Sequence, residues 1–103
     1  MPLIQLHDAD NGAQLTLAKG DSLVVTLSSN PTTGYSWEMQ HNDHFSVSHR
    51  YEPEGRRAGS SGTDIFELTP LSPGKSGSIA FLYRRAWEDK QAERSFSIRY
   101  EIT

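Results

Sequence analysis

In the stretch Ser95-Phe96-Ser97-Ile98-Arg99-Tyr100-Glu101-Ile102, every second residue is a large aliphatic or aromatic one. Successive side chains of a β-strand point to opposite faces, so this period of two predicts a strand with one buried and one solvent-facing side. The same alternation recurs through the chain, and no stretch has helical spacing. It predicts eight strands, over residues 3–8, 13–18, 22–28, 35–40, 45–51, 63–69, 76–84 and 94–102.

Short strands separated by turn residues are typical of an all-β fold, an immunoglobulin-like antiparallel β-sandwich. The connection Ala9-Asp10-Asn11-Gly12 contains Asn-Gly, which predicts a hairpin between the first two strands. If successive strands alternate in direction, every second connection falls at the same pole. One pole then carries short, ordinary turns, and the other carries three unusual segments, residues 29–34, 52–62 and 85–93. Function concentrates in loops grafted on one end of a rigid sandwich.

Composition narrows the class of protein. The chain has 103 residues, which fits a single domain spanning 1–103, and it has no cysteine. The sandwich must therefore be held without a disulfide, by packing of four aromatic residues: Trp37, Phe66, Phe81 and Phe96. A formal net charge of -3 argues against binding nucleic acid through bulk positive charge. We expect no membrane span and see no targeting signal at the start of the chain, and the compartment stays open.

Each unusual segment has a physical character of its own. In the first, Pro31 restrains the backbone and Gly34 can adopt a positive φ that returns the chain into the next strand. The second has glycines around two serines and can lie extended against another backbone, or serve as a plain connection. The third carries Trp87 beside Arg85, two residue types enriched at binding hot spots, although Trp87 can also cap the core.

Enzyme and metal interpretations are poorly supported. Gly59-Ser60-Ser61-Gly62 is not a nucleophile elbow, and no strand-to-helix turn is predicted there. Three of the four histidines, His41, His44 and His49, lie near one another in sequence, and they are better explained as solvated or packed side chains than as metal ligands. We therefore expect no catalytic residue, no metal and no cofactor.

The three segments together resemble the chagasin family of cysteine peptidase inhibitors. The stretch Asn30-Pro31-Thr32-Thr33-Gly34-Tyr35 is similar to that family's Asn-Pro-Thr-Thr-Gly-aromatic motif. Gly59-Ser60-Ser61-Gly62 stands where the family has Gly-x-Gly-Gly, and Arg85-Ala86-Trp87 stands where it has Arg-Pro-Trp. This chain thus has Ser61 in place of a glycine and Ala86 in place of a proline.

The resemblance implies a reversible, tight-binding inhibitor of papain-like cysteine peptidases, such as papain or cathepsin L, whose three loops occlude the active-site cleft. By this analogy Thr32 reaches the catalytic cysteine of the peptidase with Thr33 beside it. Residues 59–62 lie along the cleft, and Trp87 packs on an aromatic surface with Arg85 at the rim. The partner would be a peptidase bound one-to-one by a monomer. The alternative is an immunoglobulin-like adhesion or ligand-binding module that uses the same loops.

Overall fold

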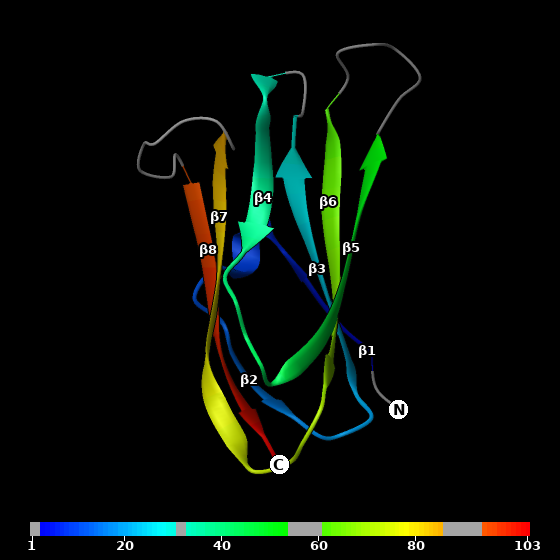
Figure 1. Cartoon of the computed structure of the whole chain (residues 1–103), viewed down its shortest axis with the longest axis vertical. Helices are drawn as coiled ribbons and strands as arrows, with labels where there is room; N and C mark the ends of the chain where they lie inside the picture. The colour runs from blue at the N-terminus through cyan, green and yellow to red at the C-terminus, as the bar shows by residue number, and fades with distance from the viewer. Residues whose placement is uncertain (1–2, 31–32, 54–60, 86–93) are drawn as a thin grey trace.

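The computed structural model of this chain describes residues 3–30, 33–53, 61–85 and 94–103. These residues form two facing β-sheets and one turn of 3-10 helix, η1 (Asp8–Asp10) (Figure 1). The strands are β1 (Leu3–His7), β2 (Gln14–Leu17), β3 (Ser22–Ser29), β4 (Tyr35–Met39), β5 (Phe45–Pro53), β6 (Gly62–Pro70), β7 (Lys75–Arg85) and β8 (Arg94–Ile102). No helix among the described residues is long and apolar enough to cross a membrane.

The strand order is that of an immunoglobulin-like sandwich. The first sheet has the order β1-β3-β6-β5, and the second has the order β2-β8-β7-β4. The antiparallel expectation is confirmed for four of the six strand pairs among the described residues, while β1 runs parallel to β3 and β2 runs parallel to β8. Successive strands nevertheless alternate in direction along the chain, as predicted. Each parallel pair joins strands that are not consecutive, so the alternation survives.

The expected hairpin between the first two strands is wrong. The strands β1 and β2 belong to different sheets, so the segment between them crosses the sandwich. In that segment the Asp10 carboxylate accepts a hydrogen bond from the His7 N–H (2.8 Å), and the Gly12 N–H donates to the Ser97 carbonyl of β8 (2.7 Å). An Asn-Gly signal predicts that the chain turns, but it does not specify which strand the chain meets afterwards.

The core lies between the two sheets and confirms the alternation. Phe96, with Ile98, Tyr100 and Ile102 of the same strand, is at most 4% exposed. The four aromatic residues expected to replace a disulfide are all buried. The Phe66 ring of the first sheet lies 4.9 Å from the Phe81 ring of the second, and Phe81 lies 5.9 Å from Phe96. Aromatic contacts therefore run from one sheet to the other through the middle of the core.

Strand β5 departs from the expected pattern because it is the outer strand of its sheet. Its alternation predicts a buried face, yet Val47 is 41% exposed and only Phe45 is buried along the strand. His49 occupies the same face, where its ring stacks on Phe66 with 4.3 Å between the ring centres. The histidine ring therefore covers one face of this core aromatic residue.

Candidate functional site

Six strand ends meet at one pole of the sandwich, as the alternation of directions predicts (Figure 1). The three predicted loops leave from these ends. The strands extend slightly further toward the pole than expected: β3 ends at Ser29, β5 at Pro53 and β7 at Arg85. Residues at both margins of each loop are therefore held in sheet hydrogen bonding, which anchors the loops on rigid elements.

The structure describes about half of the predicted site residues. Described are Asn30, Thr33, Gly34, Tyr35, Ser61, Gly62 and Arg85. Outside the described residues lie Pro31, Thr32, Gly59, Ser60, Ala86 and Trp87. The site is therefore described through its loop stems, meaning the residues at the two ends of each loop where the chain leaves one strand and enters the next.

The first loop closes on itself in a tight turn. The Thr33 N–H and the Thr33 hydroxyl both donate to the Asn30 carbonyl, at 3.2 and 2.7 Å. Gly34 has φ of 83°, which confirms the expected positive value and is a conformation that residues with a side chain rarely adopt. The Tyr35 N–H then points at the Thr33 hydroxyl oxygen (3.4 Å) as β4 begins. These bonds fix both stems of the loop that carries Thr32.

The stems of the first and third loops are bonded to each other. The Arg85 Nε donates to the Thr33 carbonyl (2.9 Å), and the Arg85 guanidinium lies 4.6 Å from the centre of the Tyr35 ring. A second link is made by Tyr83, whose hydroxyl accepts from the Asn30 N–H (3.2 Å) while its ring stacks on Tyr35 at 5.2 Å. Tyr83 is absent from the predicted site because the alternation marks it only as a core residue.

The second loop joins the same unit through Gly62. This residue begins β6, is buried, and is paired in register with Ser29 on one side and Pro53 on the other. A Cβ at this position would collide with the Glu52 carbonyl oxygen and the Tyr51 ring. Gly62 therefore lies at the start of a strand, where a larger side chain would disturb the packing. Packing requires a glycine here, whatever the residue contributes to binding.

Charges beside the second stem are paired on the surface. Arg50 donates to the Glu67 carboxylate (2.7 Å) and to the Glu52 carboxylate (3.1 Å). These hydrogen bonds, that of Glu67 first, raise the pKa of the Arg50 guanidinium above its ordinary value. Because all three groups are exposed, the pairs order the end of β5 more than they stabilise the fold.

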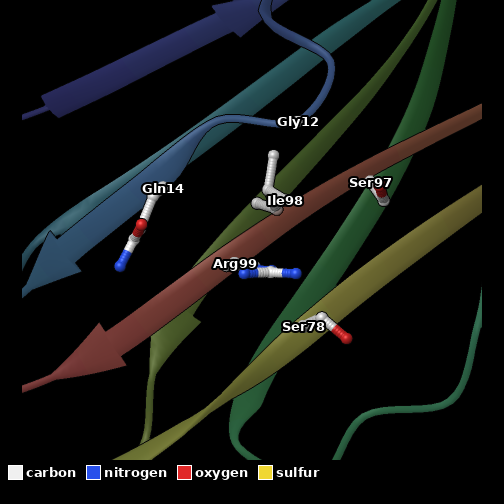
Figure 2. Close-up of a pocket in the computed structure, with 6 residues that line it drawn as sticks. All are labelled: Gly12, Gln14, Ser78, Ser97, Ile98 and Arg99. Carbon is white, nitrogen blue, oxygen red and sulfur yellow. The ribbon is translucent and has the colours of Figure 1, made fainter.

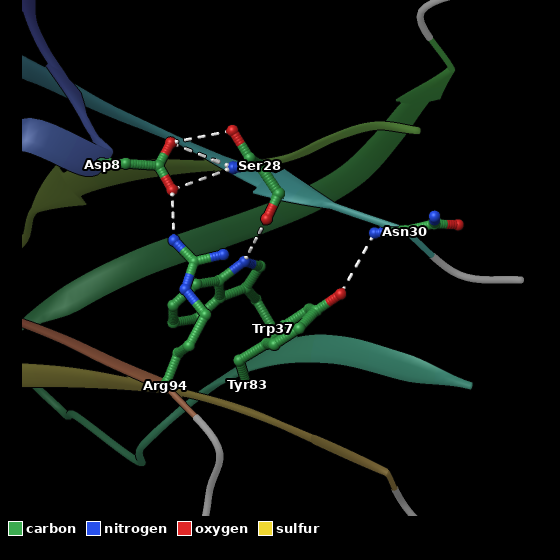
Figure 3. Close-up of polar contacts among 6 residues, drawn as sticks. All are labelled: Asp8, Ser28, Asn30, Trp37, Tyr83 and Arg94. Carbon is green, nitrogen blue, oxygen red and sulfur yellow. Dashed lines mark hydrogen bonds and ion pairs between the residues drawn. The ribbon is translucent and has the colours of Figure 1, made fainter. Parts of the chain in front are cut away.

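Trp37 joins the two sheets next to the loop stems through two hydrogen bonds. It lies on β4, the outer strand of the second sheet, and is 3% exposed. Its indole N–H donates to the Ser28 carbonyl (2.8 Å) (Figure 3). Its backbone N–H donates to the buried Asp64 carboxylate of the first sheet (3.3 Å). The other oxygen of Asp64 lies 2.7 Å from His49 Nε2. Both N–H groups of Trp37 thus donate to acceptors of the opposite sheet. These two hydrogen bonds link the sheets, which no disulfide joins.

The hollows and polar clusters that the described residues form away from the loop pole lie apart from the predicted site. Within the described ranges, no group of three or more histidine or acidic side chains is placed to hold a metal ion. A hollow of about 400 Å³ on the outer face of the second sheet is lined by Gly12, Gln14, Ser78, Ser97, Ile98 and Arg99 (Figure 2). It contains none of the predicted site residues. The chemistry available at the loop pole is that of a protruding, hydrogen-bonded surface.

Comparison with known proteins gives a consistent result. The chagasin family of peptidase inhibitors, I42, matches residues 16–102 of this chain. Chagasin of Trypanosoma cruzi is 34% identical over 87 residues, which cover 77% of this chain and 78% of chagasin. Amoebiasin-1 of Entamoeba histolytica is 28% identical over 102 residues, 96% of this chain and 99% of the relative. The crystal structure of the cysteine protease inhibitor EhICP2 from Entamoeba histolytica, 28% identical, has a TM-score of 0.91 and covers 100% of this chain and 97% of its own.

Proposed function

Since this chain belongs to the chagasin family of peptidase inhibitors, we propose that it inhibits papain-like cysteine peptidases by placing its three polar loops in their active-site cleft. The chain is an inhibitor and not an enzyme, as expected. The observation that carries the proposal is the bonding between loop stems. Arg85 ties the third loop to the first, and Gly62 ties the second loop to the first through β3.

These stem bonds explain how a small surface binds tightly. Loops that are already ordered lose little conformational entropy when they enter a cleft, so contact energy appears as affinity. In this chain Asn30 and Thr33 close the base of the first loop, and Tyr83 holds it against the second sheet. The cleft would meet loops whose stems are already held together, among them the loop that contains Thr32.

The proposed contacts follow the family pattern. Thr32 approaches the catalytic cysteine, residues 59–62 offer backbone hydrogen bonds along the cleft, and Trp87 packs on an aromatic surface of the peptidase. No bond is broken or formed, so inhibition is reversible and occurs by occlusion. The chain escapes cleavage because a loop restrained by Pro31 and Gly34 does not present a peptide bond aligned for attack.

A titration tests the proposal. Papain or cathepsin L at fixed concentration is incubated with increasing amounts of this protein, and residual activity is measured with a small fluorogenic substrate. We expect activity to fall to near zero at one-to-one stoichiometry, to return on dilution, and to leave the inhibitor chain intact by mass spectrometry.

Trypsin serves as the control, because a serine peptidase with a differently shaped cleft should keep its activity. Full papain and cathepsin L activity at micromolar inhibitor would contradict the proposal. So would inhibition that coincides with cleavage of the inhibitor, since that would make it a substrate. The alternative of an adhesion module would then have to be pursued with the same loop pole as the binding surface.

A further inference from the structure

Asp8 lies outside the three loops and ahead of residues 16–102, the part matched by the family, yet its carboxylate contacts the stems of two loops. One oxygen accepts from the Ser28 N–H and the Ser28 hydroxyl, both at 3.1 Å. The other accepts from Arg94 Nη2 at 3.1 Å (Figure 3). Ser28 belongs to the first sheet and Arg94 to the second, so a single carboxylate spans the sandwich just beneath the loop pole.

Both partners of Asp8 lie where a loop joins a strand. Ser28 lies two residues before Asn30, where the first loop leaves β3. Arg94 is the first residue of β8, directly after the third loop. Its guanidinium also lies over the rings of Trp37 (5.3 Å) and Tyr83 (5.7 Å), the residues that bond Ser28 and Asn30. Asp8 therefore holds Arg94 in an orientation that covers both aromatic supports of the first loop.

From this geometry we infer that Asp8 is a positioning residue, which sets the first and third inhibitory loops relative to each other; the inference rests on the proposed function. The Asp8 and Arg94 side chains are 33% and 47% exposed, so their ion pair adds little to the stability of the fold. The ion pair acts instead on the relative placement of the first and third loops. Without the carboxylate, the two stems lose one of their shared anchors, so part of their ordering must occur during binding, at a cost in affinity.

The main experiment compares Asp8→Ala with the parent against papain. We expect the inhibition constant to rise about fivefold to tenfold, while the melting temperature falls by only a few degrees. Asp8→Asn keeps an acceptor for Ser28 but loses the charge that holds Arg94, so its inhibition constant should lie between the two. The matched control is Asp43→Ala, which removes an exposed carboxylate paired with His41 in the connection between β4 and β5 at the opposite pole, and should leave inhibition unchanged.

A second variant distinguishes positioning from a general loss of structure. In the Trp87→Ala background, Asp8→Ala should raise the inhibition constant by less than it does in the parent, because the loop residue that it positions is already gone. Fully multiplicative effects of the two substitutions, or an Asp8→Ala inhibition constant equal to that of the parent, would overturn the inference.

Nuclear magnetic resonance of the free protein separates this inference from the proposed function. Asp8→Ala should shift the backbone amide signals of both residues 29–34 and residues 86–94. If the parent does not inhibit and these shifts still appear, the proposed function fails and the linkage of the loops by Asp8 stands. If the shifts are confined to Asp8 and its sequence neighbours, the linkage itself is wrong.

Discussion

The two sheets are joined without a disulfide, and the contact of Asp64 with Trp37 is one of the polar links between them. Replacing Asp64 tests how much this link contributes to stability. Asp64 is 3% exposed on β6, accepts the Trp37 backbone N–H across the sandwich, and pairs with His49. Replacement by Leu keeps the branched shape of the side chain, although Leu is larger, and removes both acceptor oxygens. The Trp37 N–H would then be buried without a partner, because β4 is the outer strand and this N–H points away from β7.

The expected loss follows from these contacts. A buried N–H without an acceptor costs about 1–3 kcal/mol, and the half-exposed His49 partner adds only a few tenths. We therefore expect Asp64→Leu to lower the free energy of unfolding by about 2 kcal/mol and the melting temperature by about 10 °C. Asp64→Asn offers an amide oxygen to Trp37 and an amide N–H to His49, so it should cost less than about 1 kcal/mol.

Urea unfolding, followed by tryptophan fluorescence and far-ultraviolet circular dichroism, measures both variants, with Glu67→Gln as a control for loss of an exposed carboxylate. The slope of the unfolding free energy against urea concentration should equal that of the parent if only stability changes. An Asp64→Leu protein within about 0.5 kcal/mol of the parent would refute the reasoning. So would an Asn variant as unstable as the Leu variant, since that would make the charge, and not the acceptor for Trp37, the important property.

Three further predictions concern the loops and their stems. Gly62→Ala should lower the free energy of unfolding by about 2 kcal/mol in a thermal melt, because the added Cβ meets backbone and ring atoms; an unchanged melt would contradict the packing seen here. Trp87→Ala and Thr32→Ala should each weaken inhibition of papain by at least ~30-fold at unchanged melting temperature; a variant as potent as the parent would exclude that residue from the binding site. Tyr83→Phe removes an acceptor of the Asn30 N–H and should speed hydrogen exchange of that amide, whereas equal exchange would show that the bond is dispensable.

The sequence by itself determined the strands, their alternating directions and the pole at which the loops gather. Side-chain alternation is a local property: in Phe96–Ile102 each residue reveals its face through its own polarity, without reference to the rest of the chain. The motif Asn30–Tyr35 also pointed to the inhibitor family, because it resembles that family's Asn-Pro-Thr-Thr-Gly-aromatic motif. Gly34 adopted the positive φ that such a turn requires.

Only the tertiary structure decided which strands pair, which are outermost and which polar residues join the loops. Val47 has the pattern of a core residue, but the place of its strand in the sheet exposes it. Nothing in the sequence marks Asp8 or Asp64 as a link between the sheets, since their partners lie 86 and 27 positions away in Arg94 and Trp37. The pattern of polar and apolar residues in one segment indicates which face of the strand is buried. It does not indicate which distant strands cover that face, because strand pairing depends on the packing of all strands together.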